Sequence, residues 1–176
     1  MKKVLIIESS PRKGGNSNLL CDEFARGAAE SGNAVKRIAL REKDIRFCKA
    51  CYACFKTGRC VQKDDMEEIL NEFQAADVVV LASPVYFRAI NGQMKTMIDR
   101  LLPRWQDLGG HDVYLIITGH DGKGGLSLAV KELEDIFGGM GNRMVGTIWG
   151  ERVWQKGEVF GTPAMEEAYR SGKDIR

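Results

Sequence analysis

Four cysteines lie close together in this sequence, at a spacing that suits metal binding or redox chemistry. They follow the pattern Cys48-x2-Cys51-x2-Cys54-x5-Cys60, so four of the chain's five cysteines fall within thirteen residues. Structural zinc usually takes well-separated Cys-x2-Cys pairs, which let the thiolates close a tetrahedron. Overlapping Cys-x2-Cys-x2-Cys spacing is instead typical of cubane iron–sulfur clusters, where each thiolate reaches a different iron. The spacing favours a [4Fe–4S] cluster, and zinc and free thiols stay open as alternatives.

A polar loop at residues 9–18 has the composition of an anion-binding site. It follows the apolar run Val4-Leu5-Ile6-Ile7 and precedes a helical pattern that includes Leu19. Open α/β sheets bind ligands in such loops, because unpaired N–H groups and the positive end of the helix attract an anion. The loop adds hydroxyl, amide and cationic side chains, namely Ser9, Ser10, Ser17, Asn18, Arg12 and Lys13. We therefore expect the terminal phosphate of a ligand here. The alternative is an ordinary polar connection in which Ser17 caps the helix.

The elements that would position these residues alternate between strands and helices. Short apolar runs indicate strands at residues 4–7, 34–40, 78–82, 113–117 and 144–149, with helical patterns between them. A βαβ series of this kind predicts a mostly parallel sheet with helices on both faces. The first loop lacks a G-x-G-x-x-G motif and the chain lacks a Walker loop, so the smaller five-stranded, flavodoxin-like doubly wound sheet fits best. The length predicts one domain over residues 1–176.

Local signals refine these elements. The pattern Asp64-x-x-Glu67 predicts a capping box at the start of the helix that follows. Pro84 comes directly after the strand at 78–82 and is expected to stop it. Cys21 lies beside apolar residues on the first helix and is expected in the core.

Several segments resemble one known family. Residues Ser10–Ser17 look like the phosphate loop of the flavodoxin-like NAD(P)H-dependent FMN reductases, with Ser9 standing where that motif usually begins with glycine. Asp77–Tyr86 is similar to their third strand, and Asn91–Lys95 with Ile98–Arg100 is similar to the helix after it. The cysteine spacing matches the iron–sulfur flavoproteins, a branch of this family in which four cysteines hold a [4Fe–4S] cluster near FMN.

This resemblance implies FMN as a cofactor. Tyr86 and Phe87 would lie against the flavin ring, and the alternative is an aromatic plug over the sheet end. The glycine-rich loop after residue 117 would reach the pyrimidine edge of the ring. No catalytic side chain is expected, because the flavin carries the electrons. The candidate cofactor-binding residues are Ser9, Ser10, Arg12, Asn16, Ser17, Asn18, Pro84, Val85, Tyr86, Phe87, Thr118, Gly119 and Gly124.

Composition excludes several other classes of protein. The chain has 176 residues, with 26 Lys and Arg against 24 Asp and Glu, and a net charge of +2 argues against a nucleic-acid partner. No apolar run approaches the ~18 residues of a membrane span. Only four apolar residues follow Met1-Lys2-Lys3, fewer than the ~7–15 of a secretory signal, so we expect a cytoplasmic protein.

The cysteine spacing and the phosphate loop, together with the resemblance to this family, imply an FMN-dependent oxidoreductase that passes electrons between a soluble donor and an acceptor through FMN and a [4Fe–4S] cluster. The donor would be NAD(P)H or a ferredoxin-like protein, and the acceptor a quinone or an oxygen species. The resemblance also implies a homodimer or homotetramer. The alternative is an NAD(P)H-dependent FMN or quinone reductase with no cluster, or with zinc in the cysteine loop. An electron carrier of the flavodoxin type is disfavoured, because such carriers tend to be strongly acidic.

Overall fold

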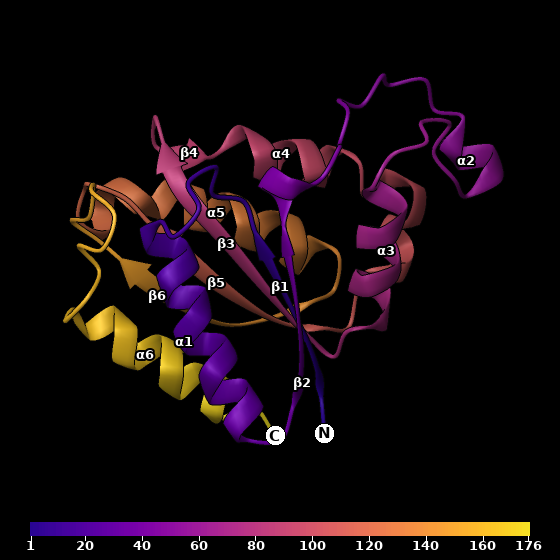
Figure 1. Cartoon of the computed structure of the whole chain (residues 1–176). Coiled ribbons are helices and arrows are strands. Elements are labelled where there is room, and N and C mark those ends of the chain that lie inside the picture. The colour runs from indigo at the N-terminus through magenta and orange to yellow at the C-terminus, as the bar shows by residue number, and fades with distance from the viewer.

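Five parallel strands form the centre of the computed structural model, which describes all of residues 1–176 (Figure 1). The strands are β1 (Lys3–Glu8), β2 (Ala34–Ala39), β3 (Val78–Tyr86), β5 (Asp112–Thr118) and β6 (Arg143–Gly150). They lie in the order β2-β1-β3-β5-β6, and the two-residue strand β4 (Ala89–Ile90) pairs antiparallel with the end of β3. This strand order is that of the flavodoxin-like doubly wound fold. The predicted fold class is therefore confirmed.

Helices cover both faces of the sheet. One face carries α1 (Asn16–Glu30) and α6 (Pro163–Lys173), and the other carries α3 (Met66–Ala75), α4 (Gly92–Asp99) and α5 (Lys123–Gly139). The short helix α2 (Cys54–Thr57) and the 3-10 helices η1 (Leu40–Glu42) and η2 (Leu102–Asp107) lie in the connections. None of these helices combines the length and the apolar character that a membrane crossing requires.

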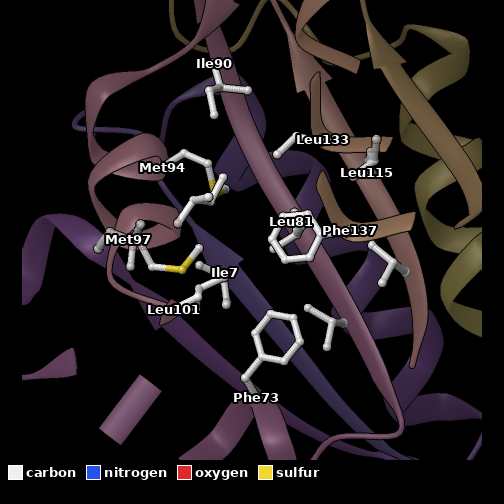
Figure 2. Close-up of a cluster of buried hydrophobic side chains, with 14 of the residues drawn as sticks. Ile7, Phe73, Leu81, Ile90, Met94, Met97, Leu101, Leu115, Leu133 and Phe137 are labelled. Atoms are coloured by element: carbon white, nitrogen blue, oxygen red, sulfur yellow. The ribbon is translucent and has the colours of Figure 1, made fainter. Parts of the chain in front are cut away.

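The central strands are buried on both faces, as their continuous apolar runs predict. In β1, Leu5 and Ile7 belong to the core under α3, α4 and α5, whereas Val4 and Ile6 belong to the core under α1 and α6. Figure 2 shows the first core, in which side chains of the three helices gather over the strands. Cys21 lies in the second core, fully buried, and burial raises the pKa of its thiol well above the usual value. This fifth cysteine is structural, as expected.

The third strand is longer than predicted. The sequence predicts that Pro84 stops it, but β3 continues through Pro84 to Tyr86. The carbonyl of Ala82 accepts a hydrogen bond from the Ser9 N–H at 2.9 Å, so the backbone groups of residues 82 and 84 point toward the β1 side. Because β1 has ended at Glu8, no strand on that side needs an N–H from residue 84, and proline is tolerated there.

The start of α3 also differs from the prediction. The pattern Asp64-x-x-Glu67 predicts a capping box, but the helix begins at Met66 and the box does not form. Asp64 accepts a hydrogen bond from the Met66 N–H at 3.3 Å, while its two oxygens bind the guanidinium of Arg100. Glu67 binds Arg104 rather than turning back to the helix start. A long-range ion pair therefore takes the carboxylate that the local pattern assigns to the cap.

Candidate functional site

A cavity of about 330 Å³ opens at the carboxyl end of the sheet. At this point the connections that follow β1 and β3 run to helices on opposite faces of the sheet. This is the position at which doubly wound sheets bind ligands, and the volume lies in the usual ligand range of ~300–1,000 Å³. Loops after β1, β5 and β6 and the β3–β4 hairpin form its walls. Ten of the thirteen candidate cofactor-binding residues line it: Ser10, Arg12, Asn16, Ser17, Pro84, Val85, Tyr86, Phe87, Thr118 and Gly119.

The loop between β1 and α1 presents the start of the helix to this cavity. The N-cap residue is Gly15, so no side chain caps the first N–H groups, and Ser17 lies in the first turn instead of at the cap. A Cβ at Gly15 would lie 3.1 Å from both the Arg12 carbonyl oxygen and Ser10 Oγ, so any larger residue would push this tight loop apart by a few tenths of an ångström. Ser10 and Ser17 are almost fully buried. Helix N–H groups, two hydroxyls and the Arg12 guanidinium thus surround a space suited to a phosphate.

Three candidate residues lie outside the cavity lining. The Ser9 hydroxyl donates a hydrogen bond to the Ala82 carbonyl at 2.9 Å and so ties the end of β1 to β3. Asn18 is buried, and its Nδ2 donates to the carboxylate of Glu8. Gly124 lies in the first turn of α5. Ser9 and Asn18 therefore hold the first loop in shape.

The β3–β4 hairpin forms the second wall. Tyr86 pairs with Ala89, so Phe87 and Arg88 make a two-residue tip. Both tip residues have positive φ, 50° and 69°, as a type I′ hairpin turn requires. The Phe87 side chain is fully exposed, and Tyr86 is 40% exposed. A plug over the sheet end would be buried, whereas these two rings leave apolar surface exposed at the cavity.

A further wall comes from the segment after β6, which contains none of the candidate cofactor-binding residues. Trp154 packs edge-on against His120, with ring centroids 5.7 Å apart. Arg12 Nη1 donates to the Trp154 carbonyl at 2.9 Å, and Asn16 Nδ2 donates to the Gln155 carbonyl at 2.8 Å. The sequence does carry a signal for this wall, because the segment directly follows the carboxyl end of a strand. Arg88, Asp121, Leu126 and Val153 complete the lining.

The clustered cysteines line a separate and much smaller cavity. Cys48, Cys51, Cys54 and Cys60 have free thiols and share a space of about 20 Å³. Ala50 and Tyr52 adopt left-handed φ values of 49° and 54°, which turn the chain sharply between the first three cysteines. No three His, Cys, Asp or Glu side chains are grouped closely enough to hold one metal ion. The thiols therefore border one space without forming a closed set of ligands.

The base of this small cavity is a buried ion pair. Arg100 lines the cavity, and its Nη1 and Nη2 donate to the two carboxylate oxygens of Asp64 at 2.7 and 2.9 Å. The side chains of both residues are only 1% exposed. The hydrogen bond to Asp64 raises the pKa of Arg100, and the Cys60 sulfur adds to the increase. A permanent positive charge thus lies beside the thiols.

One family model matches most of this chain. Residues 2–152 match the family described as NADPH-dependent FMN reductase. The chain belongs to this family. The family expected from the phosphate loop and the third strand is therefore confirmed.

Iron–sulfur flavoproteins are among the relatives of this member of the FMN reductase family. One from Archaeoglobus fulgidus is 43% identical over 103 residues, which cover 58% of this chain and 46% of that protein. Iron-sulfur flavoprotein MJ0731 from Methanocaldococcus jannaschii is 31% identical over 170 residues, which cover 88% of this chain and 85% of that protein. The chain thus spans about half the length of the first relative and most of the second. These relatives confirm the iron–sulfur flavoprotein branch.

Solved structures of low sequence identity share the fold of this member of the FMN reductase family. The azoreductase from Bacillus anthracis str. Sterne superposes with a TM-score of 0.79 at 19% identity, covering 99% of this chain and 100% of that one. At this identity the likeness supports the flavodoxin-like architecture alone.

Figure 1 shows that segments bordering the two candidate sites lie on different sides of the molecule. The cysteine segment with α2 extends at the upper right, whereas the connection between β6 and α6 lies at the left. The two cavities also have no lining residue in common. A substitution in one site should therefore leave the other intact.

Proposed function

We propose that this chain is an FMN-dependent oxidoreductase that binds FMN in the cavity at the carboxyl end of the sheet. The observation that carries this proposal is that the uncapped start of α1 and the exposed rings of Tyr86 and Phe87 border one cavity. FMN has the matching chemistry, with a phosphate dianion at one end and a flat apolar ring at the other. Membership of the FMN reductase family supports the assignment.

The chain's own residues would bind and orient the cofactor. Ser10, Arg12, Ser17 and the first N–H groups of α1 would hold the phosphate. Gly119 would keep the backbone open to the ring edge, since a Cβ there would lie 2.6 Å from Leu126 Cδ2 and 3.4 Å from Val85 Cβ. When bound, FMN supplies hydride or electron transfer, and the protein contributes position and electrostatics.

The proposal includes a [4Fe–4S] cluster held by Cys48, Cys51, Cys54 and Cys60. Their donor chemistry fits such a cluster, because four free thiols border one space. Arg100 also fits, because it lines this cavity of thiols and its buried Nε has no hydrogen-bond partner. We propose NAD(P)H or a ferredoxin-like protein as the electron donor and a quinone or an oxygen species as the acceptor. We further propose that the protein is a homodimer or homotetramer and that it works in the cytoplasm, where thiols stay reduced.

Replacing Ser17 with aspartate is expected to weaken FMN binding by roughly 100-fold, because the new carboxylate would lie beside the phosphate. Two like charges ~4 Å apart repel by about 4 kcal/mol at an effective dielectric constant of ~20, and salt screens part of this. Quenching of FMN fluorescence on titration with the apoprotein measures the dissociation constant. Riboflavin, which lacks the phosphate, should bind the variant and the wild type alike.

Ser127 provides a matched control for this charge change. It is an exposed serine on α5, so Ser127→Asp adds the same charge outside the cavity and should leave FMN affinity unchanged. Equal FMN affinity in Ser17→Asp and wild type would contradict the phosphate assignment. A wild-type chain that binds no FMN would contradict the proposed function as a whole.

Replacing Cys51 with serine is expected to abolish the cluster while FMN stays bound, because one thiolate is lost and the two sites are separate. Protein purified without oxygen is assayed for iron, acid-labile sulfide and a visible absorbance shoulder that dithionite bleaches. Cys21→Ala is the control, since this thiol lies in the core and the cluster should survive its loss. Zinc, or no metal at all, in the wild-type chain would overturn the cluster and favour the plain reductase.

A further inference from the structure

Arg100 holds together the two ends of the cysteine segment. Its Nη1 donates to the Arg46 carbonyl at 2.6 Å, just before the segment, and its guanidinium binds Asp64, just after the segment. Its side chain is 1% exposed and is the largest fully buried side chain in the chain. A single buried arginine therefore closes the loop of residues 47–63 at its base.

One donor of this guanidinium is left without a partner. Nη1 and Nη2 are used by Arg46 and Asp64, but the buried Nε makes no hydrogen bond. Buried donors normally have partners, so an unpaired one needs an explanation. Arg100 and Cys60 line the same cavity, and Cys60 adds to the raised pKa of the guanidinium. The unpaired donor thus belongs to a residue that borders the four thiols.

We propose that Arg100 is a positioning residue for the sulfur centre, which closes the base of the cysteine segment and directs its free N–H and its charge at the Cys60 ligand. This inference rests on the proposed function, because it requires the four cysteines to hold a cluster. Asp64 neutralises part of the charge and fixes the plane of the guanidinium through two hydrogen bonds. In this proposal the Nε–H of Arg100 is the donor that remains for the Cys60 sulfur.

The direction of the effect follows from charge. Reduction adds an electron to the centre, and a nearby cation and an N–H···S hydrogen bond both stabilise the additional negative charge. Burial strengthens this effect, because little water screens the guanidinium. Arg100 should therefore raise the reduction potential of the cluster, that is, make it easier to reduce.

The test measures that potential in chains purified anaerobically with FMN and cluster bound. Arg100→Gln removes the charge and Nε. We expect the equilibrium constant for reduction of the cluster to fall at least tenfold, which corresponds to a reduction potential at least 59 mV more negative for a one-electron couple. Arg100→Lys keeps a charge without the planar fork, and its potential should fall between those of Arg100→Gln and wild type. An EPR-monitored redox titration reads the cluster, and the flavin absorbance reads FMN, whose potential should not move.

Arg104 is the matched control. It lies on the neighbouring 3-10 helix, pairs with Glu67 at the surface and does not line the cavity of the thiols, so Arg104→Gln should leave the potential at the wild-type value. A role confined to holding the loop would lower the iron content of the Arg100 variants and leave the potential of the remaining clusters unchanged, which would overturn the inference. If Arg100→Gln retains no cluster, Arg100→Lys decides by the same criterion.

The two failures are distinguishable. Wild-type protein without iron and sulfide would overturn the proposed cluster, and this inference with it. If the wild-type protein holds a cluster and its potential is the same in Arg100→Gln, or in Arg100→Lys where Arg100→Gln retains no cluster, this inference alone would be overturned.

Discussion

Replacing Asp64 with asparagine is expected to lower the free energy of unfolding by about 3–5 kcal/mol, because it leaves the buried Arg100 guanidinium without a counter-charge. The size of the side chain is almost unchanged, so the effect reports the charge. For a chain of this length the loss corresponds to a fall in Tm of roughly 6–20 °C. Urea or thermal unfolding, followed by circular dichroism, measures it. The double variant Asp64→Asn with Arg100→Met should regain part of the loss, because it buries no unpaired charge.

The same ion pair gives this stability a defined pH dependence. Burial would raise the pKa of Asp64, but hydrogen bonds from Arg100 and from the backbone N–H groups of Arg46 and Met66 outweigh it and hold the pKa below its usual value. Because the folded pKa is depressed, the stabilisation is present above the unfolded value of about 3.9 and is lost as the pH falls through the lower folded value. The advantage of wild type over Asp64→Asn should therefore be constant near neutrality and shrink below about pH 4.

A surface carboxylate serves as the control for Asp64. Glu166 pairs with Arg170 one turn later on α6, where the two side chains are 65% and 70% exposed. Exposed pairs of this kind contribute about 0.3–0.5 kcal/mol, so Glu166→Gln should change stability by no more than that. A loss below about 1 kcal/mol for Asp64→Asn would show that Arg100 finds other partners and that the pair is not the base of the cysteine segment.

The features that the sequence predicts correctly depend on local pattern. Val78–Ala82 is an unbroken, Val-rich apolar run, which is typical of a strand covered on both faces, and the structure places it there. Strand-to-helix loops in a parallel sheet necessarily open at the same edge, so the loop of residues 9–18 and the loop after β5 meet at one cavity. The fold and most of the cavity lining follow from these two rules.

The features that the sequence does not predict depend on partners far along the chain. No local pattern marks Arg100 as buried; its side chain is 1% exposed because it pairs with Asp64, thirty-six residues earlier. Arg12, 142 residues away, binds the Trp154 carbonyl and so links the segment after β6 to the first loop. Pro84 stays in its strand because β1 has already ended beside it. The conformational preferences of neighbouring residues do not predict such long-range contacts.

Adding a methyl group at Gly172 is expected to destabilise the chain at or above the upper end of the ~1–3 kcal/mol that overpacking usually costs. Helices α1 and α6 cross there in near-contact: a Cβ at Gly172 would collide with the Phe24 carbonyl oxygen, and a Cβ at Gly27 with the Tyr169 carbonyl oxygen. Backbone atoms cannot turn aside as a side chain would, so the helices must separate. We expect Gly172→Ala to lower Tm by about 6 °C or more.

A second glycine in a helix gives the opposite expectation and so provides the control. Gly138 lies inside α5, and the nearest atom to its Cβ position is the Met144 side chain at 4.0 Å. Gly138→Ala should therefore stabilise the chain by about 0.4–1 kcal/mol, because alanine restricts the unfolded state without a clash.

Gly172→Ala should also weaken FMN binding. Helix α1 carries the proposed phosphate-binding turn, and Arg12 and Asn16 bind the segment before α6, so a shift of the two helices would disturb the site. If both variants raise Tm, α1 and α6 are not in near-contact at Gly172, and their packing does not position the start of α1.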